Sequence, residues 1–171
     1  MRYVIHLFDV GENYYFFCTG IALVVLFGTR ACKFSWDKSI AAALAAAYMF
    51  IVLTITVFKR GPTDLPKNYF PPFWAYGMII SKSKIARDLA IQIIMNVIML
   101  APLGFLIPFF VEKKPILLGA ACSITIELIQ LITRKGYFEI DDIIHNTIGF
   151  FIGYLVYRLI MKMNWVHKAE S

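Results

Sequence analysis

The residues with the clearest chemical potential lie between Ser123 and Gly153. Two of them, Glu127 and Gln130, stand inside an apolar segment, and four more open the apolar segment that follows: Asp141, Asp142, His145 and Asn146. An ionisable group inside a hydrocarbon-facing segment is costly, so it usually faces the protein interior and marks a functional site. Carboxyl groups in such a place could transfer protons or hold a polar ligand, and amides could orient that ligand.

The composition indicates what kind of protein positions these groups. Of the 171 residues, 60% are apolar and only 16% are charged, and the mean hydropathy is +0.69. A membrane span needs ~20 apolar residues to cross ~30 Å of hydrocarbon, and the chain has several such runs. We therefore expect an all-α fold, a polytopic membrane helical bundle that forms a single domain of residues 1–171. The net charge of +6 is spread over loops, which favours contact with anionic lipid and not with nucleic acid.

Five transmembrane helices are expected, at about residues 13–29, 39–58, 89–111, 116–133 and 142–162. Pro102 lies inside the third span, where it should kink or break the helix because proline cannot donate to the helical ladder. The link 59–88 contains four prolines and cannot be one helix. Its FPPFW segment, Phe70 to Trp74, either lies at the membrane interface or folds back over the spans as a lid. From Tyr76 onward the link becomes amphipathic, which predicts a short interfacial helix running into the third span.

Three of these spans place polar groups at a similar depth on one side of the membrane. Asn96 lies about seven residues into the third span and Glu127 about six residues before the end of the fourth, which corresponds to ~10 Å and ~9 Å. His145 and Asn146 lie in the first turn of the fifth span, ~5–6 Å deep. We therefore predict a carboxylate-containing pocket with a basic rim. The rim residues are Lys59, Arg60, Arg87, Arg134 and Lys135.

Each polar residue also has a purely structural interpretation. Asp141 and Asp142 could simply cap the fifth helix and interact with its dipole, although Asp142 shares a helix face with Asn146, which favours a role in the site. Asn96 and Asn146 could only bond between helices. Glu127 could be a buried partner of Arg134. The spacing carries no metal-ligand signature, so no metal site is predicted.

Basic residues in short loops set the orientation of a membrane protein. The short loops on the side of the carboxyl terminus carry most of their charge as lysine and arginine. This pattern predicts a cytoplasmic carboxyl terminus, an amino terminus outside, and a pocket at the outer leaflet.

Three motifs are similar to those of the VanZ-like family of bacterial membrane proteins. They are N-x5-P-L-G from Asn96 to Gly104, S-x3-E-L-I-Q from Ser123 to Gln130, and R-x6-D-D-I-I-x-N-T-I-G from Arg134 to Gly149. The resemblance covers about residues 68–157. It implies a multi-pass protein of the bacterial cytoplasmic membrane that is associated with lowered susceptibility to teicoplanin, a lipoglycopeptide. His145 stands where the family usually has other residues.

Three mechanisms remain open. A binding protein would hold an envelope lipid, polyprenyl-linked or otherwise, or a lipoglycopeptide. A membrane enzyme would modify a lipid head group, with Glu127 and Asp142 as its catalytic residues. A transporter would move a polyprenyl lipid between leaflets. The predicted ligand-binding residues are Asn96, Gln130, Arg134, Asp141, Asn146 and Arg87. Neither a cofactor nor the oligomeric state follows from the sequence.

Overall fold

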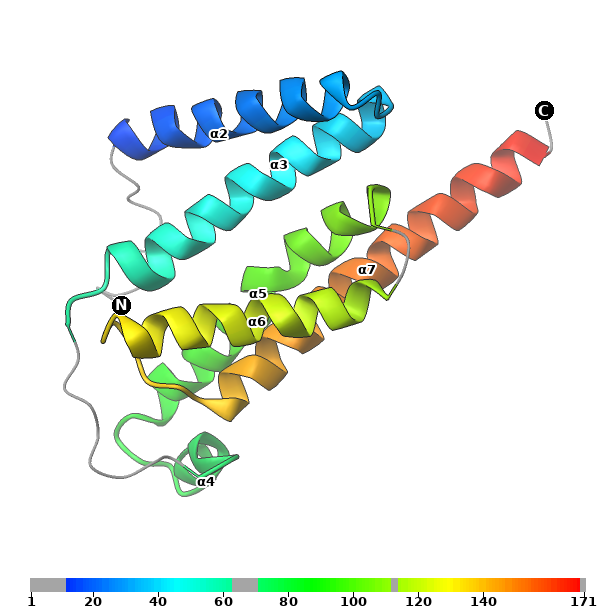
Figure 1. Cartoon of the computed structure of the whole chain (residues 1–171). Helices are drawn as coiled ribbons and strands as arrows, with labels where there is room; N and C mark the ends of the chain where they lie inside the picture. The colour runs from blue at the N-terminus through cyan, green and yellow to red at the C-terminus, as the bar shows by residue number, and fades with distance from the viewer. Residues whose placement is uncertain (1–11, 63–70, 112–113, 170–171) are drawn as a thin grey trace.

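The computed structural model describes residues 12–62, 71–111 and 114–169, and these residues form helices without any strand. Figure 1 shows the arrangement. The elements are α2 (Glu12–Ala31), α3 (Trp36–Leu53) with the π-helical turn η1 (Thr54–Phe58), α4 (Trp74–Ile80), α5 (Ala86–Leu106) with the 3-10 turn η2 (Ile107–Phe109), α6 (Pro115–Ile132) and α7 (Ile140–Ala169).

The expected all-α membrane bundle is confirmed. Within the described residues, four helices are long and apolar enough to cross a membrane: Asn13–Ala31, Trp36–Phe58, Ala86–Phe109 and Ile140–Met163. The remaining predicted span corresponds to α6, which has 18 residues and measures ~27 Å at 1.5 Å per residue. This helix is therefore slightly shorter than the ~30 Å hydrocarbon core.

The bundle is built around α5, which packs most extensively on α7. Glycines allow these two helices to touch through their backbones. A Cβ atom at Gly149 would lie 1.8 Å from the carbonyl oxygen of Val97, and one at Gly153 would lie 1.9 Å from that of Ala101. The second contact lies four residues further along both helices than the first, so α5 and α7 run parallel. Small residues permit this close packing, which drives helix association inside a membrane.

The neighbouring helices cover this pair on two sides. Gly119 brings α6 against the ring of Phe150 on α7, and Phe150 and Leu100 are both completely buried. The hydroxyl group of Tyr48 on α3 donates a hydrogen bond to the carbonyl oxygen of Met99, 3.0 Å away, which links α3 to α5. In Figure 1, α2 lies along the outer side of α3, and the last turns of α7 extend beyond the other helices.

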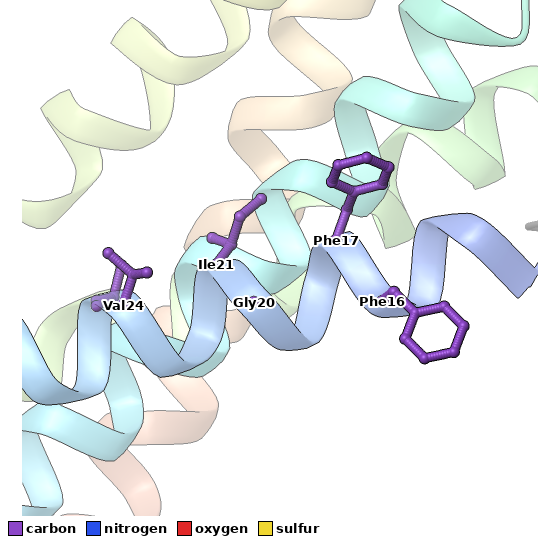
Figure 2. A pocket seen from close by; sticks show the side chains of 6 residues that line it. Phe16, Phe17, Gly20, Ile21 and Val24 are labelled. Atoms are coloured by element: carbon purple, nitrogen blue, oxygen red, sulfur yellow. The ribbon is translucent and has the colours of Figure 1, made fainter.

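The outward face of α2 is apolar. Phe16, Phe17, Ile21 and Val24 surround a surface hollow at Gly20 (Figure 2). Phe16 and Val24 are among the most exposed apolar residues of the described chain. In a membrane this face meets lipid.

One detail of the predicted helices was wrong, and of the kink or break expected at Pro102 the break does not occur. The amphipathic segment after Tyr76 does not run into the third span, because α4 ends at Ile80 and α5 begins only at Ala86. Lys82 adopts a left-handed φ of 52°, and the Ser83 amide donates to the carbonyl oxygen of Met78, which closes the helix end. Pro102 does not break α5, which continues to Leu106 before tightening into η2.

The glycine contact between α5 and α7 can be tested by adding one methyl group. Gly149→Ala should lower the thermal unfolding temperature in detergent, because the new Cβ overlaps backbone atoms of Val97 and overpacking costs about 1–3 kcal/mol. Gly28→Ala on α2 is the matched control, since no atom lies within 4 Å of its added Cβ. An equal effect of both changes on the unfolding temperature would contradict this packing.

Candidate functional site

The predicted polar residues gather at the end of the bundle where α6 ends and α7 begins. The end of α3, the whole of α4 and the first turns of α5 meet at the same end (Figure 1). Five elements, from three stretches of the chain that are distant in sequence, therefore contribute side chains or backbone groups to one region.

The turn after α6 brings the backbone back over a buried carboxyl group. The Lys135 amide donates to the Gln130 carbonyl oxygen at 2.9 Å and the Arg134 amide donates to that of Leu131 at 3.2 Å, with Arg134 at a left-handed φ of 55°. This is a Schellman ending. The loop then returns, so that the Glu139 amide donates to Oε2 of Glu127 at 3.2 Å. Glu127 is only 2% exposed.

Three carboxyl groups and one guanidinium form an electrostatic cluster. The carboxyl groups of Asp142 and Glu139 interact electrostatically with that of Glu127, and the Arg60 guanidinium interacts electrostatically with all three. The side-chain amide of Gln92 on α5 lies beside Asp142. The cluster therefore joins α5, α6, α7 and the residues that follow α3.

The segment after η1 is attached to the turn after α6 by polar contacts. The Lys135 ammonium donates to the Arg60 carbonyl oxygen at 2.7 Å, and the Gln130 amide nitrogen donates to the Thr56 carbonyl oxygen at 3.3 Å. Gly136 is buried between the Gln130 and Arg60 side chains. These contacts hold the exposed Arg60 at the edge of the carboxyl cluster.

The described part of the aromatic segment, residues 71–74, lies against the first turn of α7; Phe70 lies outside the described residues. The Phe73 amide donates to both Asp141 carboxylate oxygens, at 2.8 and 2.9 Å. The Trp74 indole donates to Oε2 of Glu139 at 3.2 Å. We call residues 71–80, which comprise this segment and α4, the aromatic flap.

A further contact of the aromatic flap reaches the second turn of α7. The Tyr76 hydroxyl group and Nε2 of His145 lie 2.6 Å apart. The other ring nitrogen of His145, Nδ1, is buried without a hydrogen-bond partner in the described part of the chain. His145 thus joins the flap to the bundle.

One helical turn deeper than the carboxyl cluster lies a layer of neutral polar residues. Gln92 and Asp142 are neighbours, so the residues four positions further along the parallel helices, Asn96 and Asn146, lie at one level. Glu127 interacts electrostatically with Asp142, and Gly119 touches Phe150. The antiparallel register between these two contacts places Ser123 opposite Asn146.

The deep layer is buried and lacks internal hydrogen bonds. Asn146 is 1% exposed and Ser123 is fully buried. Neither amide atom of Asn146, nor Oγ of Ser123, nor Nδ2 of Asn96 has a partner in the described residues. Buried polar atoms normally have partners, so this layer has unused capacity to bind polar groups. Phe150 and Leu100 close it from below.

The VanZ/LLP1 family model matches residues 40–161. The chain belongs to the VanZ/LLP1 family. The match extends from α3 through α7 and so contains the whole cluster, whereas α2 precedes it. No curated protein matches the chain. No solved structure matches it either.

In this VanZ/LLP1 protein, six of the predicted site residues lie together at one end of the bundle. Glu127, Asp142 and Gln130 lie in or beside the carboxyl cluster, and Asn96 and Asn146 lie in the deep layer. Asp141 lies there too, but its carboxylate holds the aromatic flap. Their roles as catalytic or ligand-binding residues remain predictions.

The other two predicted residues lie at the same end of the bundle but outside the carboxyl cluster and the deep layer. Arg134 forms the turn after α6, and Arg87 is exposed in the first turn of α5 without a hydrogen bond to a described site residue. Arg60 was predicted only as part of the rim, and neither Glu139 nor Ser123 was predicted to belong to the site. Ser123 could have been found, because it precedes Glu127 by one helical turn.

Burial raises the pKa of Glu139 above its ordinary value of 4.5, while the Trp74 hydrogen bond opposes this shift and Asp141 adds to it. Glu139 lies in the loop between α6 and α7. Its protonated form is thus favoured in the folded protein, and the stability that it contributes declines as the pH rises through the folded pKa.

Removing the Asp141 carboxylate should release the aromatic flap. In Asp141→Ala, backbone amides of residues 73–80 should exchange hydrogen faster, because a hydrogen bond to a charged group contributes about 1.5–3 kcal/mol. Hydrogen-exchange mass spectrometry in detergent measures this. Asp37→Ala, which removes an exposed carboxylate from the first turn of α3, is the control. Unchanged exchange of the flap in Asp141→Ala would disprove the attachment.

Glu139→Gln should change how stability depends on pH. Glutamine keeps an acceptor for the Trp74 indole but does not titrate. The unfolding temperature of Glu139→Gln minus that of the wild type should therefore become more positive as the pH rises above about 4.5. Thermal unfolding of both proteins between about pH 4 and about pH 8 shows in which direction this difference changes. A difference that becomes more negative would refute it.

Proposed function

We propose that this VanZ/LLP1 protein binds the polar head group of an envelope lipid, or of a lipoglycopeptide, at the acidic end of its α5–α6–α7 bundle. We further propose that this binding lowers susceptibility to teicoplanin. The charge pattern of the loops supports an orientation with that end at the outer leaflet and the carboxyl terminus in the cytoplasm. A lipid head group or a lipid-anchored antibiotic would meet the site there.

One observation carries the proposal: buried polar groups with free bonding capacity lie directly beneath buried carboxyl groups. A carboxyl group such as Glu127, 2% exposed, is costly to bury unless partners compensate it. The Glu139 amide supplies one partner, and the unpaired atoms of Asn146 and Ser123 offer places for more. A polar head group would satisfy both layers at once.

The rim fits the phosphate that many envelope lipids carry. Arg60 lies at the edge of the cluster, and the Lys135 ammonium donates a hydrogen bond to the Arg60 carbonyl oxygen. A guanidinium group can bind phosphate through two parallel hydrogen bonds. Beside the site, the exposed rings of Phe73 and Tyr76 would contact the apolar part of the ligand.

Binding is favoured over catalysis because the described residues offer no activated nucleophile. Ser123 is the hydroxyl residue on the Glu127 face of α6, and its Oγ has no hydrogen-bonded base there. His145 is engaged by Tyr76. A nucleophilic serine normally needs a base within hydrogen-bonding distance. Glu127 and Asp142 remain the pair that could transfer protons if a bound head group were modified.

The test compares lipids bound to purified protein by native mass spectrometry. Wild type should retain a lipid from a bacterial membrane extract. Glu127→Gln should retain at least about tenfold less of that lipid, which corresponds to ~1.4 kcal/mol of binding free energy. Asp88→Asn, an exposed carboxylate changed in the same way in α5, should behave as wild type. Expressed in a susceptible bacterium, only wild type and Asp88→Asn should lower teicoplanin susceptibility. Identical lipid profiles for all three proteins would overturn the proposal.

A further inference from the structure

We propose that the head group in this site carries a primary ammonium, as in an aminophospholipid, and that Glu127 and Asp142 bind it with help from Asn146. This inference rests on the proposed lipid-binding function and specifies its chemistry. It follows from the charge balance of the cluster and, independently, from the unpaired atoms of the deep layer.

The carboxyl cluster has more acidic groups than cations. Glu127, Glu139 and Asp142 interact with one guanidinium, that of Arg60, which is itself exposed. The nearby ammonium of Lys135 is directed to a backbone carbonyl oxygen. Burial without a cation favours the neutral form of such carboxyl groups, and a bound cation would pair with their ionised form, so the cluster can accept a ligand that adds positive charge.

The deep layer supplies hydrogen-bond acceptors directly below the carboxyl groups. Oδ1 of Asn146 and Oγ of Ser123 are buried and have no partner in the described residues. They lie one helical turn below Asp142 and Glu127, respectively, on the helix faces that carry those carboxyl groups. A primary ammonium has three N–H donors, and the two carboxyl groups and Asn146 provide one acceptor for each.

This geometry distinguishes among the common phospholipid head groups. A trimethylammonium group has the positive charge but no N–H donor, so it would leave Asn146 unpaired. A glycerol head group has hydrogen-bond donors but no positive charge. In an ethanolamine head group, two carbons separate the ammonium from the phosphate, which would then lie towards Arg60 at the rim.

The experiment measures binding of three lipids with identical acyl chains to the delipidated full-length protein by native mass spectrometry. The probes are phosphatidylethanolamine, phosphatidylcholine and phosphatidylglycerol. We expect phosphatidylethanolamine to bind at least about tenfold more tightly than either other lipid, a difference of ~1.4 kcal/mol. Equal or tighter binding of phosphatidylcholine would show that charge suffices and would overturn the donor argument. Equal or tighter binding of phosphatidylglycerol would overturn the ammonium but leave lipid binding intact. No binding of any lipid would overturn both proposals.

Two variants separate a ligand role from a packing role for the deep layer. Asn146→Leu removes a buried, unpaired amide, so it should leave the unfolding temperature unchanged or raise it, while phosphatidylethanolamine affinity falls about tenfold, the ~1.4 kcal/mol expected of one lost hydrogen bond. Glu127→Gln should reduce the preference for phosphatidylethanolamine over phosphatidylglycerol. Unchanged phosphatidylethanolamine affinity in a folded Asn146→Leu protein would refute the proposal.

Discussion

The backbone contact between α5 and α7 is the constraint on which the rest of the structure depends. Gly149 and Gly153 allow α7 to touch the carbonyl groups of Val97 and Ala101. Direct backbone contact leaves no freedom to slide, because the next register would place a side chain where only a hydrogen atom fits. The parallel register that results brings Gln92 beside Asp142 and sets Asn96 level with Asn146.

The third helix of the site depends on the same pair. Gly119 seats α6 on the Phe150 ring, and this contact fixes the antiparallel register of α6 and α7. Glu127 then faces Asp142, and Ser123 lies opposite Asn146. The polar groups form two layers because all three helices rise by the same ~1.5 Å per residue, so one correct contact between two helices aligns every later turn.

Loops complete the site with backbone groups that helices cannot offer. Helix interiors use their amides internally, whereas the loop after α6 has free amides, and one of them binds Glu127. The aromatic flap donates its Phe73 amide to Asp141 in the same way. Both contacts depend on left-handed residues, Arg134 and Phe73. A left-handed conformation costs a non-glycine residue ~1–2 kcal/mol, and the charged hydrogen bonds that it permits offset this cost.

The sequence by itself determined that the protein is a helical membrane bundle of the VanZ type. It also predicted that Asn96, Glu127 and Asn146 lie near one end of that bundle, where the structure separates them into two layers. Hydropathy and the helical rise are local properties, so one chain suffices to estimate them. Only the tertiary structure decided that Arg60 and Glu139 join the cluster, that Asp141 holds the aromatic flap, and that Arg87 is exposed outside the polar network. Those outcomes depend on how each helix is rotated and on where Lys82 and Arg134 reverse the chain. Rotation is fixed by glycine contacts between distant segments, and reversal by left-handed residues that are not glycine, so neither could be read from local patterns.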